Sequence, residues 1–246
     1  MSEVMLHPLP GISTGTPLFI VPSAGSSPMT LFELARHLSV SAFGFSFPGL
    51  EDNLPPKTSI EEISTAFVDG ARQAQPAGPY SICGHCWGGI VALDMVSKLE
   101  KMGDKVNLLV LLESLPPVLS QDVWNGQARE NDPRTGIMKP GQALKIMMEQ
   151  IDENISKLPA ILRPHFEKFC HDQIKMGSNY RAAPIKARIS LLRTPCFPRS
   201  VFERWGTFSK SGYSDRIVPG DQFSMLHSPH VETVASRIAE QLASSS

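Results

Sequence analysis

The chain lacks an excess of charge of either sign. Its 246 residues include 23 lysines and arginines against 24 aspartates and glutamates, which gives a formal net charge of −1. Proteins that bind nucleic acids through their phosphates usually carry a basic patch or stripe, and none is visible along this sequence. We therefore expect no nucleic-acid partner.

Long hydrophobic runs are missing as well. No stretch approaches the roughly 18 consecutive apolar residues that a membrane-spanning helix needs. The first residues, MSEVMLHPLPGISTG, do not join a basic segment to an apolar one as a signal peptide does. The sequence thus predicts a soluble, cytoplasmic protein with no membrane partner.

Cysteine is scarce. Cys83, Cys86, Cys170 and Cys196 are too few and too scattered for a disulfide framework, and we expect them to be reduced. A metal site built on Cys83, His85 and Cys86 would need further ligands, yet the chain has no second cluster at metal-ligand spacing. We expect no metal. The sequence also shows no internal repeat.

Short apolar runs alternate with amphipathic segments along most of the chain. This alternation predicts an α/β fold, and the uninterrupted run VNLLVLLE is typical of a parallel strand covered on both faces. A hydrophobic content of 41% supports one sizeable core, so we expect a single domain over residues 1–246. The expected strands are at 17–22, 42–47, 78–83, 106–113, 187–193 and 213–220, and the expected helices at 30–38, 58–75, 87–103, 141–158, 160–177 and 228–243.

Two of these helices carry start signals. Ser59 stands three residues before Glu62, which is the spacing of a capping box and predicts a helix that begins just after Ser59. In the last helix we expect Ser228 as the cap and Pro229 in the first turn.

The segment YSICGHCWGGI, residues 80–90, carries the strongest chemical signal. Gly84, Cys86 and Gly88 match the pattern G-x-nucleophile-x-G between an expected strand and an expected helix. In such a turn the nucleophile has a strained backbone, and the glycines avoid clashes. The helix N-terminus favours a thiolate and an oxyanion. The alternatives for Cys86 are a structural thiol, a metal ligand or a redox partner of Cys83, which we expect to be a core thiol at the strand end.

The segment GHCWGG resembles the GHSxGG elbow of the thioesterase domains that release products from nonribosomal peptide and polyketide synthetases. PLFIVPSAGSS, SFPGLEDN and VPGDQFSML resemble further segments of the same family, so the likeness covers nearly the whole chain. The resemblance implies an α/β-hydrolase fold, in which a mostly parallel central sheet is flanked by helices. It also implies a helical lid inserted at about residues 115–185.

The resemblance implies roles for individual residues. Cys86 corresponds to the nucleophile, and the backbone amides of Ala24 and Trp87 to the oxyanion hole. Glu113 takes the place of the acid of the triad, where the family usually has aspartate. Three apolar residues of the lid would line an acyl tunnel, or would simply pack in the core: Met147, Met148 and Ile151.

One position departs from the family pattern G-x-H-x-x-x-L. The chain reads GDQFSML at residues 220–226, so that Gln222 occupies the position of the catalytic histidine. Glutamine can hydrogen-bond to a thiol but cannot accept its proton. His227 follows this loop and is the candidate for a replacement base; its alternative role is a residue beside the cap of the last helix.

Together these residues predict acyl transfer or product release through a Cys86 acyl-enzyme. The substrate would be a small-molecule acyl group on the phosphopantetheine arm of an acyl or peptidyl carrier protein, with no bound cofactor. A thiol with a pKa near 8.5, lowered at a helix N-terminus, would be partly ionised without a base. Hydrolysis should be slow, because a positioned base contributes roughly 10² to 10⁴ in rate. Hydrolysis, cyclisation and condensation remain open.

Two other functions fit the same residues. The chain could be a catalytically impaired or trapped variant, or an accessory acyl-binding protein, because Gln222 replaces the base. It could also be a carboxylesterase of the same fold that acts on free esters.

Overall fold

A seven-stranded sheet forms the centre of the molecule. The structure is a computed structural model that describes residues 5–50, 55–117 and 140–244. The strand order is β1-β3-β2-β4-β5-β6-β7. The strands are β1 (Leu6–Pro8), β2 (Leu18–Val21), β3 (Ala42–Phe45), β4 (Tyr80–His85), β5 (Val106–Leu112), β6 (Arg188–Arg193) and β7 (Tyr213–Ile217).

All neighbouring strands are parallel except β1, which runs antiparallel to β3 at one edge. The six expected strands are present, whereas β1 was not expected. It has only three residues, and two of them are exposed, so it lacks the hydrophobic pattern that identifies a strand. The parallel arrangement brings the C-terminal ends of β2, β4 and β5 to one edge of the sheet.

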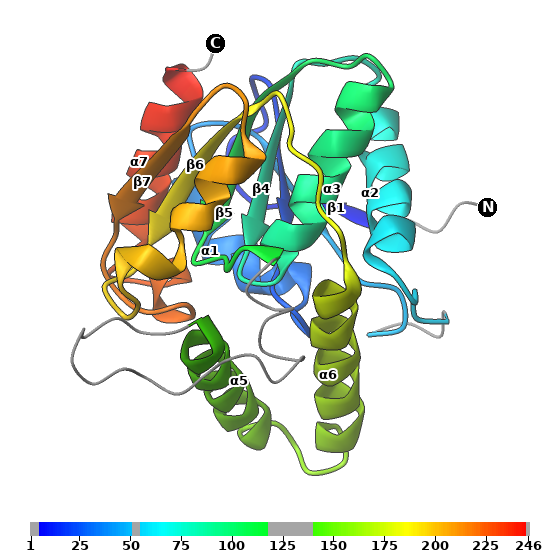
Figure 1. Ribbon diagram of the computed structural model, residues 1–246, viewed down its shortest axis with the longest axis vertical. Helices are drawn as coiled ribbons and strands as arrows, with labels where there is room; N and C mark the ends of the chain where they lie inside the picture. Colours follow the sequence, from blue (N-terminus) through cyan, green and yellow to red (C-terminus); the bar gives the residue numbers. More distant parts are fainter. Residues whose placement is uncertain (1–4, 51–54, 118–139, 245–246) are drawn as a thin grey trace.

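Helices cover both faces of the sheet (Figure 1). The helices α2 (Ile60–Ala74) and α3 (Gly88–Lys101) pack on one face, and α1 (Phe32–His37) and α7 (Val231–Ala243) pack on the other. Each face has its own hydrophobic cluster. Cys83 belongs to the cluster beneath α1 and α7, and Cys86 belongs to the cluster beneath α2 and α3.

Two further helices separate β5 from β6 in the chain. They are α5 (Pro140–Ser156) and α6 (Arg163–Asn179), and both lie beyond the edge of the sheet at which β4 and β5 end (Figure 1). Both expected helices are therefore present, with shifts of up to three residues at their ends. Residues 118–139 of the expected lid lie outside the described residues.

The two predicted helix starts have different outcomes. Ser59 is the N-cap of α2, where its hydroxyl accepts the Glu62 N–H at 3.2 Å, and Glu62 in turn accepts the Thr58 N–H at 2.9 Å. The expected cap of the last helix is wrong. α7 begins at Val231, and residues 228–230 form a turn in which the Ser228 N–H donates to Glu33 Oε1 at 2.7 Å.

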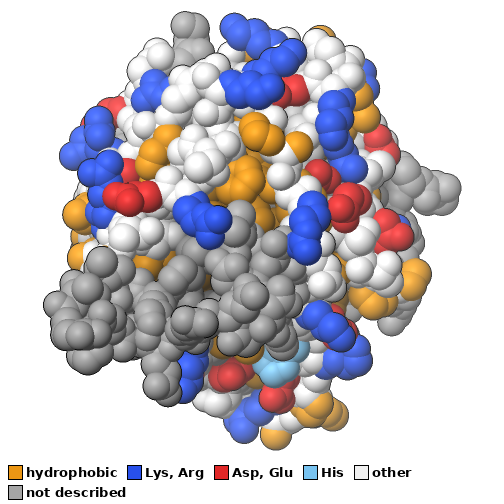
Figure 2. Space-filling model, in the orientation of Figure 1, with side chains coloured by type: hydrophobic (Ala, Val, Ile, Leu, Met, Phe, Trp, Pro, Cys, Tyr) orange, Lys and Arg blue, Asp and Glu red, His pale blue; other side chains and the backbone are white. Residues whose placement is uncertain are grey.

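Charged side chains are dispersed over the surface. On the face drawn in Figure 2, lysine and arginine side chains are separated by acidic and uncharged ones. Within the described ranges, every helix is either too short or too polar to span a bilayer.

Replacing Ser59 with alanine should reduce the free energy of unfolding by about 1 kcal/mol, because the Glu62 N–H then loses its acceptor at the start of α2. Urea unfolding followed by circular dichroism measures this difference. Ser59→Asp retains an acceptor for the Glu62 N–H and serves as the matched control. Its free energy of unfolding should stay close to that of the wild type. Equal losses in both variants would contradict the capping role.

Candidate active site

The turn between β4 and α3 holds Cys86 in a strained conformation. Its φ angle is 51°, in the left-handed region that non-glycine residues rarely adopt. A Cβ on Gly84 would lie 2.5 Å from Gly89 Cα, and one on Gly88 would collide with the Pro22 carbonyl oxygen. Only glycine fits at these two positions, so the expected sharp turn from strand to helix is present.

Burial sets the ionisation of Cys86, of which only 4% is exposed. Desolvation raises the pKa of its thiol, and the nearby charge of Glu113 raises it further. The Ser23 hydroxyl and the Trp87 amide act in the opposite direction but do not outweigh burial. The expectation of a thiol that the helix N-terminus keeps partly ionised is therefore wrong, because the site excludes water.

Glu113 directly follows β5 and is fully buried. Its φ angle is 44°, so a second non-glycine residue at this edge of the sheet is strained. One carboxylate oxygen, Oε2, accepts the Thr194 N–H, and the other, Oε1, is buried without a partner in the described part of the chain. Burial raises the pKa of Glu113 to about 7.

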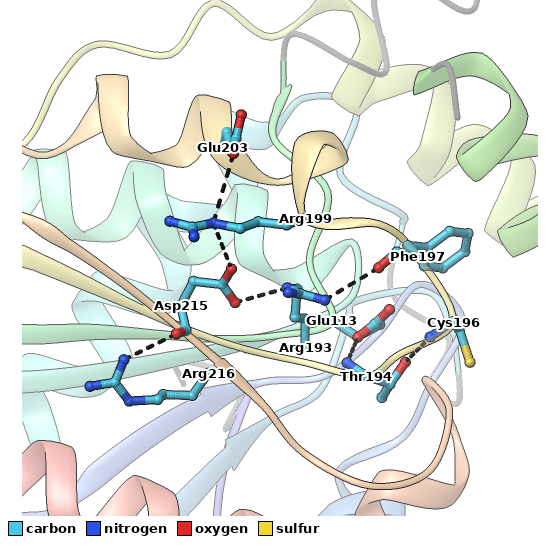
Figure 3. Close-up of polar contacts among 9 residues, drawn as sticks. All are labelled: Glu113, Arg193, Thr194, Cys196, Phe197, Arg199, Glu203, Asp215 and Arg216. Atoms are coloured by element: carbon cyan, nitrogen blue, oxygen red, sulfur yellow. Dashed lines mark hydrogen bonds and ion pairs between the residues drawn. The ribbon is translucent and has the colours of Figure 1, made fainter. Parts of the chain in front are cut away.

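The nearest cation does not neutralise Glu113 (Figure 3). The Arg193 guanidinium lowers the pKa of Glu113, but it is bound to Asp215 at 2.9 Å and donates to the Phe197 carbonyl. Asp215 also pairs with Arg199 at 3.4 Å. The carboxyl of Glu113 is thus held by the Thr194 amide beside an ion-pair network that is already satisfied.

Gln222 lies against the thiol, as its position in the loop after β7 predicts. The Cys86 thiol donates to Gln222 Oε1 at 3.8 Å, and Gln222 is 1% exposed, with Nε2 unpartnered among the described residues. His85 holds the loop, because its Nε2 donates to the Gln222 carbonyl at 2.6 Å. Burial lowers the pKa of His85 to about 4, so its ring is neutral at pH 7.

The structure does not bring His227 to Cys86. The His227 side chain is 53% exposed, and its Nδ1 lies 2.8 Å from Oε2 of Glu33 in the first turn of α1. This contact holds the ring at the surface.

The predicted oxyanion residues and the apolar lid residues are all at least partly buried. Ala24 is buried in the loop that follows β2, and Trp87 is buried at the N-terminus of α3. Two of the three apolar lid residues, Met147 and Ile151, are buried in the core cluster, and Met148 packs against it. Within the described ranges, no group of three or more potential ligands could hold a metal ion.

Sequence reasoning missed two residues near Cys86. Ser23, which is buried in the loop after β2, lowers the pKa of the thiol through its hydroxyl. Gln173 of α6 accepts the Gly25 N–H at 2.9 Å, across 148 residues of sequence. The small-residue run SAGSS indicated a loop, but no local pattern could indicate that α6 reaches it.

A cavity of about 780 Å³ opens between α6, the loop after β3 and the start of α2. Its apolar wall includes Phe47, Ile63, Phe169 and Met176, and Gln173 lines it as well. The described lining residues do not include Cys86 or the three apolar residues that were expected to form a tunnel. One lining residue, Phe47, contacts the elbow, since the rings of Phe47 and Trp87 lie 5.7 Å apart.

Comparisons with known proteins agree with this geometry. The family model described as "Thioesterase domain" matches residues 16–244. The atromentin synthetase of Tapinella panuoides is 29% identical over 255 residues, which cover 88% of this chain and 26% of the synthetase. The inactive atromentin synthetase invA6 of Paxillus involutus is 30% identical over 151 residues, 61% of this chain and 15% of that protein. The chain thus spans about a quarter or less of these relatives.

A solved structure of similar fold is the NocB thioesterase domain in covalent complex with a fluorophosphonate nocardicin G analogue. Its TM-score is 0.74 at 23% identity, over 96% of this chain and 99% of that chain. The likeness confirms the expected α/β-hydrolase fold.

The buried carboxyl of Glu113 should make stability depend on pH. An ordinary glutamate ionises near pH 4.5, whereas Glu113 in the folded protein ionises near pH 7. Between these values the folded state binds more protons, so the free energy of unfolding falls as pH rises, by roughly 2–3 kcal/mol in total. The side chain of Glu113→Gln cannot ionise, so the free energy of unfolding of this variant should not show the fall with rising pH. Urea unfolding of both proteins at pH 4.5, 6 and 7.5 measures the difference.

The comparison isolates Glu113, because the two proteins share every other titrating group. His85 contributes a rise in stability over part of the same range in both of them, since its pKa is lowered by burial. Parallel pH profiles for wild type and variant would show that the Glu113 pKa is not raised.

Proposed function

The chain belongs to the thioesterase domain family, and we propose that it transfers or releases acyl groups through a Cys86 acyl-enzyme. The observation that carries the proposal is the strained turn in which Cys86 has a φ angle of 51° between β4 and α3. A strained non-glycine residue persists only where the surrounding structure enforces it, and such strain clusters at active sites. The substrate we propose is a thioester on the phosphopantetheine arm of an acyl or peptidyl carrier protein, because the relatives are synthetases.

The first step exchanges one thioester for another. The sulfur of Cys86 attacks the thioester carbonyl carbon, while the amides of Ala24 and Trp87 stabilise the oxyanion. When the intermediate collapses, the bond from carbon to the pantetheine sulfur breaks. The pantetheine sulfur leaves with the proton that Cys86 gave up. One thiol replaces another, so the step needs no net proton acceptor; the raised pKa of Cys86 nevertheless slows it, because the thiolate is the attacking form.

Gln222 supports this step by holding the proton of Cys86 in position. Its Oε1 accepts from the thiol at 3.8 Å, and the bond from His85 to the Gln222 carbonyl fixes the loop. An amide oxygen cannot take the proton away, so Gln222 orients the thiol without acting as a base.

The second step needs an acceptor for the proton of the incoming nucleophile. Glu113 suits this role, since its Oε1 is buried without a partner in the described ranges and its pKa is about 7. His227 does not suit it, because Glu33 holds it at the surface. With no histidine beside the thiol, we expect release to be the slow step. Water, an internal nucleophile and a second substrate remain as possible acceptors of the acyl group.

A second candidate is a domain that binds acyl groups with little or no turnover. Gln222 at the position of the base and the raised pKa of Cys86 both favour it. Several of the relatives carry "inactive" in their names, including invA6 and invA3 of Paxillus involutus.

Incubation with acyl-pantetheine thioesters should give a stable adduct on Cys86, because acylation only exchanges one thiol for another, whereas release needs a base. Intact-protein mass spectrometry should show one added acyl group per chain within minutes. Cys86→Ala should show none. Cys86→Ser is the matched control, and its hydroxyl should remain unacylated, since an alcohol needs a base beside it and Gln222 in that position cannot act as one.

The absence of any adduct or product with a range of thioesters would favour the acyl-binding candidate. Turnover of free chromogenic esters as fast as pantetheine thioesters would instead favour a carboxylesterase.

Gln222→His should accelerate release of the acyl group by roughly 10² or more, because it places a base beside the nucleophile. The decay of the acyl-enzyme mass with time measures this rate. Gln222→Asn is the matched control, since it keeps an amide and should give no gain. If the histidine variant released the acyl group no faster, the rest of the catalytic arrangement would not be competent.

A further inference from the structure

Gln173 connects α6 to the loop that carries Ser23 and Ala24. It is 1% exposed, and its Oε1 accepts the Gly25 N–H at 2.9 Å. The sulfur of Cys170, one turn earlier in α6, lies directly against Gly25, where it would collide with any Cβ at that position. Gly25 is therefore held by α6 at two points. Because Ala24 precedes it in the chain, these contacts also restrict the amide of Ala24.

The other end of the same side chain has no partner. Gln173 Nε2 is buried, and no acceptor lies within hydrogen-bonding distance of it in the described ranges. Buried polar groups are nearly always paired, so an unpaired amide donor is a position where a ligand oxygen would bind favourably. Gln173 is also one of the residues that line the cavity of about 780 Å³. A small rotation of the side chain would present Nε2 to an acceptor on a molecule in this cavity.

The cavity wall defines the rest of such a molecule. Phe47, Ile63, Phe169 and Met176 contribute apolar surface. Phe47 also contacts the ring of Trp87, the residue after Cys86, so one wall of the cavity is shared with the elbow. An apolar chain with one oxygen acceptor matches these surroundings.

We propose that Gln173 is a positioning and specificity-determining residue that acts at both ends of its amide. Its Nε2 donates to a carbonyl oxygen within an apolar acyl chain, in addition to the carbonyl of the thioester. Its Oε1 holds Gly25, and with it the oxyanion loop, in the arrangement that acylation of Cys86 requires. This inference rests on the proposed function, because it concerns the acyl group that Cys86 accepts.

The test uses two acyl-pantetheine thioesters of equal chain length, one with an amide carbonyl within the acyl chain and one with a plain alkyl chain. The rate of Cys86 acylation is measured by intact mass over a range of concentrations. The wild type should prefer the amide-bearing chain by roughly tenfold, the value of one ordinary hydrogen bond. Most of this preference should appear as a lower thioester concentration for half-maximal acylation, and little of it as a higher maximal rate.

Gln173→Met keeps the size of the side chain and removes both hydrogen bonds. The preference should fall to about one, and the maximal acylation rate with the alkyl chain should fall roughly tenfold, because the oxyanion loop is no longer held. Gln173→Glu keeps an oxygen for the Gly25 N–H, so it should lose the preference but retain the alkyl rate. Glu167→Gln changes an exposed residue on the same helix and is the control. Its preference and its alkyl rate should both match those of the wild type.

Two results would overturn the proposal separately. A preference that survives in Gln173→Met would exclude the donor role, and an unchanged alkyl rate in that variant would exclude the role in holding the loop. The lost Gly25 hydrogen bond should itself lower the thermal midpoint of Gln173→Met slightly, so acylation is compared at a temperature well below the midpoint of every variant.

Failure of the proposed function is distinguishable from failure of this inference. If the wild type is not acylated, the two roles are measured without catalysis. Titration calorimetry with analogues in which nitrogen replaces the thioester sulfur should still show the preference, and Gln173→Met should abolish it. Hydrogen exchange of the peptide around Gly25 should accelerate at least tenfold in Gln173→Met, and unchanged exchange would exclude the hold on the loop.

Discussion

The close approach of three backbone segments at the end of β4 is the constraint on which the site depends. Gly84 lies against the start of α3, and Gly88 lies against the end of β2, with no space for a side chain at either position. Cys86 between them must adopt a left-handed conformation, and its N–H donates to the Leu112 carbonyl at 2.8 Å. This turn presents the thiol at the sheet edge where β2, β4 and β5 end, so residues from the following loops converge on it.

Burial at this edge determines the chemistry as much as the residue types do. Desolvation raises the pKa of Cys86 and of Glu113, and lowers that of His85, so all three groups are biased toward their neutral forms. A neutral thiol attacks slowly, because the thiolate is the nucleophile, and hydrolysis needs a base as well. Among the described residues, several polar atoms at the site are unpaired, and such atoms are where a substrate gains hydrogen bonds.

Local patterns in the sequence were reliable where a few consecutive residues carry the signal. The capping box at Ser59, the strand VNLLVLLE and the glycines at 84 and 88 all predicted their structures, although Gly88 meets the distant Pro22. The cap predicted at Ser228 failed because residues 228–230 form a turn and α7 begins only at Val231. The edge strand β1 was missed because it is too short and too exposed to show a period.

The sequence by itself determined the α/β architecture and the sharp turn at Cys86, since these depend on spacing, glycine and residue identity. Only the tertiary structure decided the ionisation of Cys86 and Glu113, the position of His227 on Glu33, and the contact of Gln173 with the loop after β2. The physical reason is that desolvation and long-range hydrogen bonds depend on what surrounds a group in space. Residues 148 positions apart, such as Gly25 and Gln173, show no sign of that neighbourhood in the chain.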